Sequence, residues 1–408
     1  ERPDIDAIYM GVLHRLGEPG GWPLTMFLDS DARPFWGGTY FPKEARFGRP
    51  AFVTVLLRIA EAYRSQPDNV QSNAEKLIAA LTQAAPGDGT FAITEAFVRD
   101  LARGITNTVD PEHGGLSGAP KFPQWSIFWL LWRGAIRFKD AAAEQAVLTT
   151  LTHIAQGGIY DHLGGGFARY SVDARWLVPH FEKMLYDNAL LLDLFTDVWR
   201  ESQQHVFRGR IEETVAWLSR EMLVEDAAFA ASLDADSEGE EGKFYVWQAA
   251  EVRDVLGAND FVFFSKIYGV SDAGNFEGHS ILNRLEHPDW LGAQDEAHLG
   301  EMRAKLFNRR ALRIPPGRDG KVLADWNGLT IAALARASAV FNRRDWLAMA
   351  EAAFAFIAER MQAADGRLWH AWCAGVARAP GTAADYANMT SAALRLYQAT
   401  GEVRYLEA

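Results

Sequence analysis

The chain has 408 residues, of which 49% are hydrophobic and 12% aromatic. It carries 41 Lys and Arg against 53 Asp and Glu, for a formal net charge of −12. This charge argues against nucleic acid as the main partner, because nucleic-acid-binding proteins usually show a basic stripe. The net charge also disfavours a polyanionic substrate, although it does not exclude a local basic pocket. No apolar run reaches the roughly 18 residues of a membrane span, so no membrane partner is expected.

Cys373 is the single cysteine, which leaves no internal disulfide and favours a reducing, cytoplasmic location. The chain begins at Glu1 without a signal pattern, which suggests that an N-terminal piece is missing. The length predicts two or three domains, although a ring of helical hairpins could use most of it as one. The pattern of residues gives no indication of the oligomeric state.

The N-terminal segment alternates helical and extended patterns. Apolar spacing predicts, in order, a helix, two strands of a hairpin and a long helical stretch: residues 3–16, 24–28, 33–40 and 51–84. Such an order is typical of part of an α/β domain. The run Ala85–Thr90 (APGDGT) is a linker pattern. We therefore expect a partial α/β unit at residues 1–84, a linker at 85–93 and a second domain at 94–408.

The second domain is predicted to consist of long helices separated by loops. The predicted helices are residues 96–106, 127–139, 142–156, 179–202, 207–221, 248–256, 260–268, 297–308, 328–341, 344–361 and 387–399. Every second or third loop is long and rich in Gly, aromatic and charged residues: 110–123, 157–179, 229–247, 315–327 and 365–386. This repeat predicts an (α/α) toroid in which the long loops converge on one cavity at the same end of the ring.

The stretch WLVPHFEKMLYDN, residues 176–188, is the first candidate site. With a helix beginning at Pro179, the residues His180, Lys183 and Asp187 would share one helix face. The helix dipole would then favour neutral His180 as a general base or acid. Lys183 would hold the substrate and Asp187 would orient both. The alternative is a polar layer that joins two helices.

The second candidate site is the acidic stretch SLDADSEGEEGKFYVW, residues 232–247. Asp234 and Asp236 resemble the start of a calcium loop, but Tyr245 occupies the position where such a loop needs Glu, so no metal is predicted. The two aspartates could instead supply the carboxylates of a glycosidase. The alternative is an acidic hairpin turn that Tyr245 and Trp247 cap.

Two further loops contribute candidates. In KVLADWNGL, Asp325 or Asn327 would cap the next helix, and Trp326 could form the floor of a sugar site. In GGLSGAPKFP, residues 114–123, the order of residues excludes a phosphate-binding P-loop, and Lys121 could point into the cavity.

The motifs GGWPLTMFL, PFWGGTYFP, GGLSGAPKFP, GGGFARYSVDARWLVPHFEKMLYDN and KVLADWNGL resemble the spermatogenesis-associated protein 20 family. That resemblance implies a thioredoxin-like domain followed by a six-hairpin toroid. It also implies a Cys-x-x-Cys motif before the ERPDID segment, which this chain does not contain. In the resemblance, Pro23 matches the cis-proline of thioredoxin-type domains, with a structural turn as the alternative. More distantly, the toroid resembles N-acetylglucosamine 2-epimerase and the six-hairpin glycosidases.

These observations favour a carbohydrate-active toroid that acts by acid/base chemistry without a cofactor on a small, sugar-like ligand. The predicted catalytic residues are His180, Asp187, Asp234 and Asp236, with His279 and His370 as possible second bases. The predicted substrate-binding residues are Lys121, Asp161, Arg169, Trp176, Lys183, Tyr245, Trp247, Asp325 and Trp326. The alternatives are a thioredoxin-like redox or client-binding protein with the toroid as recognition module, and a catalytically inactive ring that only binds.

Overall fold

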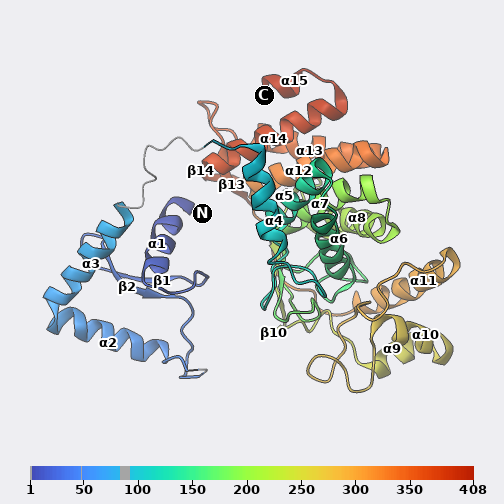
Figure 1. Cartoon of the computed structure of the whole chain (residues 1–408), viewed down its shortest axis with the longest axis horizontal. Helices are drawn as coiled ribbons and strands as arrows, with labels where there is room; N and C mark the ends of the chain where they lie inside the picture. The colour runs from blue at the N-terminus through green and yellow to red at the C-terminus, as the bar shows by residue number, and fades with distance from the viewer. Residues whose placement is uncertain (1, 47, 83–91) are drawn as a thin grey trace. The chain divides into compact units, whose positions relative to one another are not determined.

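The computed structural model describes residues 2–46, 48–82 and 92–408. Contacts between Cα atoms divide the chain into two units, Glu1–Ala92 and Ile93–Ala408 (Figure 1). Most of the linker predicted at residues 85–93 lies outside the described residues.

The first unit is a two-stranded hairpin with three helices. Its elements are α1 (Pro3–Arg15), β1 (Thr25–Leu28), β2 (Pro34–Gly38), α2 (Phe52–Ser65) and α3 (Pro67–Thr82). The strands pair antiparallel, and Phe35 packs with Val70 and Ala74. The stretch 51–84 is thus two helices, because Pro67 has no N–H to continue α2 but suits a first helical position. The Trp22–Pro23 bond is cis, as the family resemblance implied.

The second unit is mainly helical. Its helices are α4 (Glu95–Thr106), α5 (Trp125–Phe138), α6 (Ala141–Gln156), α7 (Leu185–Ser202), α8 (His205–Trp217), α9 (Ala249–Leu256), α10 (Ala258–Tyr268), α11 (Ala293–Arg310), α12 (Ala324–Phe341), α13 (Arg344–Arg360), α14 (Ala383–Thr400) and α15 (Arg404–Glu407), with one π-helical turn at Leu218–Met222. Short strands line the loops: β3 (Tyr170–Ser171), β4 (Pro179–His180), β5 (Lys183–Met184), β6 (Leu223–Val224), β7 (Ala228–Phe229), β8 (Ser232–Leu233), β9 (Asp236–Ser237), β10 (Glu240–Glu241), β11 (Arg318–Asp319), β12 (Val322–Leu323), β13 (Trp369–Cys373) and β14 (Val376–Pro380). None of the described helices combines the length and apolar character that a membrane crossing requires.

Four helices, α5, α7, α12 and α14, form an inner row whose neighbours run in the same direction. Contacts between their first turns join Trp125 to Asp187, Tyr186 to Trp326 and Asp325 to Asp385. Near their last turns, Arg133 and Arg336 both lie 3.4 Å from Asp197. The helices α6, α8 and α13 return between them, which is the arrangement of an (α/α) toroid. The predicted fold class, a mainly α toroid preceded by an α/β unit, is confirmed.

The helices α9–α11 form a smaller cluster within this unit, set apart from the inner row (Figure 1). Trp247, Phe264, Leu299 and Met302 build its own apolar core. It is attached to the ring by an ion pair of Arg303 with Glu213 of α8 at 2.6 Å and by packing of Leu163 against its core. The loop 229–247 and this cluster therefore interrupt the regular succession of hairpins.

Two inner helices each carry an asparagine at their fourth residue, and the two side chains make the same set of hydrogen bonds. Asn188 of α7 binds the backbone N–H and C=O of Phe167, and Asn327 of α12 does the same with Phe229. Each amide also donates to a backbone carbonyl four residues earlier. The prediction that Asp325 or Asn327 caps a helix is wrong, because α12 begins earlier, at Ala324, with Leu323 at the cap position.

Asn327→Ala is expected to lower the free energy of unfolding by about 2–4 kcal/mol, because it leaves the N–H and C=O of Phe229 buried without a partner. Urea unfolding followed by circular dichroism measures this loss. Asn308→Ala, at an exposed position of α11, is the matched control and should stay within about 0.5 kcal/mol. Equal effects of the two substitutions would contradict the proposed anchoring role.

Candidate active site

The first turns of the inner helices and the loops before them bring polar and aromatic side chains to one end of the ring. Trp125 begins α5, Asp187 lies in the first turn of α7, Trp326 in that of α12 and Asp385 in that of α14. Two of these four residues, Trp326 and Asp385, lie in the long loops 315–327 and 365–386 identified in the sequence. This end of the ring is the candidate site.

His180 lies at this end but on a strand, which corrects the predicted helix 179–202. Pro179–His180 pairs with Tyr170–Ser171, and α7 begins only at Leu185. Because His180, Lys183 and Asp187 do not share a helix, the predicted common face does not exist. The His180 ring stacks on Tyr170 with centroids 5.0 Å apart.

Two carboxylates flank the His180 imidazole. Glu182 Oε2 lies 3.7 Å from Nε2, and Glu241 Oε1 lies 2.7 Å from Nδ1. Glu182 and Glu241 raise the pKa of His180 against the effect of its partial burial. This is the opposite of the lowered pKa expected from a helix N-terminus, because no helix begins there. Near neutral pH the group is therefore better suited to donate a proton.

Asp187 is a buried carboxyl group at this end. Its side chain is 4% exposed, and Oδ1 accepts a hydrogen bond from Trp125 Nε1 at 3.2 Å. Oδ2 has no hydrogen-bond partner among the described residues. Burial raises the pKa of Asp187 to about 7, although the Trp125 bond and the charge of Arg169 act in the opposite direction. A carboxyl group that titrates near neutrality suits proton transfer.

Half-buried aromatic rings stand beside Asp187. The Tyr186 ring lies 4.8 Å from Trp326 and 6.4 Å from Trp125, measured between centroids. Arg169, predicted to bind substrate, donates to Glu182 at 3.2 Å and lies close enough for its charge to act on Asp187. Partly exposed aromatic faces next to hydrogen-bonding groups are typical of sites for ring-shaped polar ligands.

A second imidazole–carboxylate pair lies between β13 and α14. His370 Nδ1 is 3.0 Å from both Asp385 carboxylate oxygens, and this bond raises the pKa of His370. Asp385 Oδ1 also accepts the backbone N–H of Asp325. Burial and the Asp385 charge raise the pKa of Asp325. The Asp385 carboxylate thus fixes the orientation of His370, which the sequence identified only as a possible second base.

Asp325, His370 and Asp385 also have donor atoms within 4.8 Å of one another, the one such set of three found in the described part of the chain. Their donors would suit a divalent cation in composition. However, both Asp385 oxygens already accept backbone N–H groups, from Asp325 and Thr382. Hydrogen bonding within the protein therefore accounts for this cluster.

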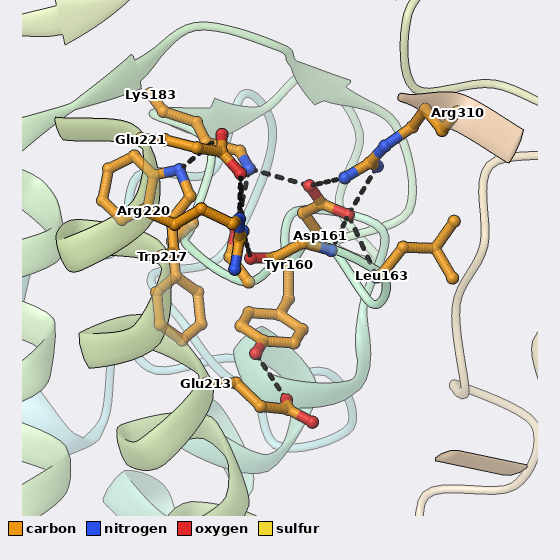
Figure 2. A network of polar contacts seen from close by, with 12 residues as sticks. Tyr160, Asp161, Leu163, Lys183, Glu213, Trp217, Arg220, Glu221 and Arg310 are labelled. Atoms are coloured by element: carbon orange, nitrogen blue, oxygen red, sulfur yellow. Dashed lines mark hydrogen bonds and ion pairs between the residues drawn. The ribbon is translucent and has the colours of Figure 1, made fainter. Parts of the chain in front are cut away.

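Asp161 and Lys183, both predicted to bind substrate, are instead the centre of a buried ion network (Figure 2). Asp161 contacts Lys183 Nζ at 2.9 Å and the Arg310 guanidinium through two bonds, at 2.8 and 2.9 Å. The cavity beside them measures 30 Å³, which holds about one water molecule. Although burial opposes ionisation, the charges of Arg310 and Lys183 lower the pKa of Asp161. These groups therefore have a structural role.

Four more predicted substrate-binding residues are directed into the protein. Lys121 is buried and donates to Asp110 and to Gly114 O. Trp176 and Trp247 are 0% exposed, and Tyr245 stacks against Phe181 beside the small cavity. The expectation that these side chains face a shared cavity is wrong. Each packs beneath the loops instead, because a long loop needs buried side chains to hold it in place.

Asp234 and Asp236 lie on the exposed side of the β8–β10 segment. Asp236 N donates to Asp234 Oδ1 at 3.4 Å, a bond within the turn. The backbone of Asp234 is bound to Gly317. Their assignment as a glycosidic pair stays a prediction. His279 lies in another turn, where Nδ1 contacts Glu277 O.

Sequence reasoning missed several residues of this end: Trp125, Tyr186, Glu241 and Asp385. One signal was available. The sequences YDN at 186–188, DWN at 325–327 and DYAN at 385–388 each combine an aromatic residue, an aspartate and an asparagine at the start of an inner helix. Comparing these three segments identifies Asp385 and Tyr186. Glu241 gave no such signal, because it reaches His180 from a distant hairpin.

The fold and site define a chain with an N-terminal thioredoxin-like unit and an (α/α) toroid. Residues 1–82 match the family model Thioredox_DsbH, described as a protein of unknown function, DUF255. The chain is 32% identical to spermatogenesis-associated protein 20 of Homo sapiens and 31% identical to that of Rattus norvegicus, over 100% of its own length and 58% of theirs. The chain is thus similar over its whole length to spermatogenesis-associated protein 20, and it spans 58% of the length of these relatives.

Solved structures with a similar course of the chain have low identity. A family 76 glycoside hydrolase from a bovine Bacteroides thetaiotaomicron strain is 13% identical, with a TM-score of 0.45 over 98% of this chain and 65% of that one. A sugar epimerase from a ruminal bacterium is 12% identical, with a TM-score of 0.34 over 74% of this chain and 79% of that one. These values carry no inference about ligand or chemistry here.

Asp187→Asn should make folding stability less dependent on pH. Because the pKa of Asp187 rises from 3.8 when unfolded to about 7 when folded, the wild type loses stability as pH rises through this interval. The loss approaches about 4 kcal/mol above pH 7, from about three pKa units. Urea unfolding from pH 4 to 8 measures it. The advantage of the variant should grow with pH and then level off; a difference independent of pH would contradict the raised pKa.

Asp161→Asn should lower the free energy of unfolding by about 3–5 kcal/mol, because it leaves Lys183 and Arg310 buried without their carboxylate. Denaturant unfolding of the second unit reports the loss. Asp254→Asn, an exposed position on α9, provides the control and should change little. A loss below about 1 kcal/mol for Asp161→Asn would show that the network is dispensable.

Proposed function

We propose that the first-turn end of the ring binds a sugar or sugar-like molecule and transfers protons to and from it. The observation that carries the proposal is Asp187: a buried carboxyl group with a pKa of about 7, beside the half-buried rings of Trp125 and Tyr186. Aromatic faces pack against the apolar face of a sugar ring, and nearby polar groups bind its hydroxyls. Of the predicted ligand classes, an uncharged small molecule fits this end best.

The acid/base roles follow from the charge around each group. His370, oriented by Asp385, and His180, flanked by Glu182 and Glu241, have raised pKa values and serve as proton donors. Asp187, near neutrality, serves as the group that accepts a proton and returns it. In an epimerase or isomerase, one group removes a proton next to a carbonyl and another replaces it. This version uses residues that the structure gathers at one end.

A glycosidase-like version needs two carboxyl groups on either side of the scissile bond. Asp187 would be the protonated acid, and Asp325, in the first turn of the neighbouring inner helix α12, would be its partner, with Asp234 or Asp236 as the pair expected from the sequence. Epimerisation or isomerisation is favoured, because the two carboxylate-bound imidazoles have no assigned task in simple hydrolysis.

Proton transfer is tested by incubating the chain with monosaccharides and disaccharides in D₂O and following deuterium incorporation next to the carbonyl by NMR. The expected result is exchange that falls by about 10²–10⁴-fold in Asp187→Asn and in His370→Gln. Asp272→Asn, with its side chain 84% exposed, should retain full exchange. No exchange with any sugar by the folded protein, or undiminished exchange in both variants, would overturn the proposal.

A second candidate function rests on the first unit. Residues 1–82 match a thioredoxin-like family model, and Trp22 of this unit is 65% exposed. The unit would then belong to a redox or client-binding domain, with the ring as its recognition module. This alternative predicts thiol-dependent activity in longer relatives that carry a Cys-x-x-Cys motif, and no sugar turnover by the ring. A small-molecule partner and a cytoplasmic location are part of the first proposal only.

A further inference from the structure

The opposite end of the ring holds a separate cleft of 630 Å³. It is lined by the last turns of the four inner helices α5, α7, α12 and α14. Its volume lies within the range of about 300–1,000 Å³ that small-molecule sites occupy. Because the inner helices are parallel, this cleft is an inner-helix length away from Asp187 and is no part of the candidate active site.

The cleft is rich in arginine. Five guanidinium groups stand against two carboxylates, although the chain as a whole carries −12. The lining charged residues are Arg133, Arg137, Arg200, Arg336, Arg395, Asp197 and Glu201. A local excess of positive charge on an acidic protein indicates a preference for anions.

One carboxylate is shared by three of these arginines. Asp197, 5% exposed, lies 3.4 Å from Arg133, 3.8 Å from Arg200 and 3.4 Å from Arg336. Arg336 also pairs with Asp193 at 3.1 Å, and Arg200 pairs with Glu201 at 3.1 Å. Each guanidinium group carries five N–H donors, which is more than these ion pairs use. The arrangement therefore keeps donor capacity for another anion.

Arg133 and Arg395 show where that capacity lies, whereas Arg336 is paired with Asp193 and Asp197. The Arg133 side chain is 58% exposed and meets Asp197 through Nε at 3.4 Å. Arg395 donates to Gln398, and no carboxylate within the described ranges lies at ion-pair distance from it. Guanidinium groups with free N–H donors bind phosphate and carboxylate oxygens in pairs of hydrogen bonds.

The rest of the lining is apolar. Trp132, Ile136, Ala339 and Val340 contribute carbon surface beside the arginines. A site of this composition suits a ligand with one strongly charged group and an apolar body, whereas a bare inorganic ion would leave the apolar part uncovered.

We propose that this cleft binds a phosphorylated small molecule, with its phosphoryl group on the arginines and its apolar part against Ile136 and Val340. A phosphoryl group is favoured over a single carboxylate because it offers more acceptor oxygens to converging guanidinium groups. The proposal is independent of the sugar site, because no residue is shared between them.

The test is isothermal titration of the chain at low salt with phenyl phosphate, with pyrophosphate and with benzoate. Phenyl phosphate is expected to bind at least tenfold more tightly than benzoate. Arg395→Gln and Arg200→Gln should each weaken phenyl phosphate binding at least tenfold. Arg367→Gln, whose side chain is 80% exposed on another surface, is the matched control, and Asp187→Asn should bind normally.

Three results would overturn the proposal. Absence of binding would mean that the arginines only offset Asp197, Glu201 and the negative ends of the inner helices. Equal weakening in Arg367→Gln would indicate non-specific attraction. Equal or tighter binding of benzoate would assign the cleft to carboxylates instead. Unchanged unfolding midpoints of the arginine variants exclude misfolding as the cause of lost binding.

Discussion

The Asp161 carboxylate, buried between Lys183 and Arg310, is the interaction on which the candidate site depends. It joins three parts of the sequence: the glycine-rich loop before β3, the strand β5 and the end of α11 (Figure 2). Lys183 in turn pairs through its backbone with Leu233 of β8, and α7 begins two residues later. A buried charge triad of this kind is costly to break, so it holds the start of α7, and with it Asp187, in one position.

The two ends of the inner row differ in chemistry because parallel helices present like ends together. The first turns of α7, α12 and α14 carry Asp187, Asp325 and Asp385, which favour the positive ends of helix dipoles. The last turns of α5 and α7 carry Arg137 and Arg200, which favour the negative ends, and Arg336 and Arg395 lie just before the last turns of α12 and α14. At the first-turn end, burial raises the pKa of Asp187 to about 7, although the hydrogen bond from Trp125 acts in the opposite direction. At the other end, arginines outnumber the carboxylates. The same architecture thus produces one end suited to proton transfer and one suited to anions.

The fold was largely predictable, whereas the site was predictable only in part. Apolar periodicity identified each long helix of the ring, and errors came at the starts, where α7 and α12 differ from prediction by several residues. These starts depend on strand pairing with distant segments, such as β5 with β8 directly before α7, which no local pattern reveals. Contacts with distant segments also explain why Glu241 was missed and why the buried positions of Lys183 and Trp176 were not predicted. A charged or aromatic loop residue can anchor the loop as readily as bind a ligand. His180, Asp187, Asp325 and Trp326 were identified from their types and positions alone.

The most direct test of the account is the indole N–H spectrum of ¹⁵N-labelled tryptophan during titration with monosaccharides. The account places Trp125 and Trp326 at the ligand-binding end and Trp217 and Trp247 in the core. It predicts that the first two indole signals, assigned by Trp→Phe substitution, shift on addition of a bound sugar while the two core signals stay in place. Shifts confined to other tryptophans, or no shift with any sugar, would contradict the assignment of this end as the binding site.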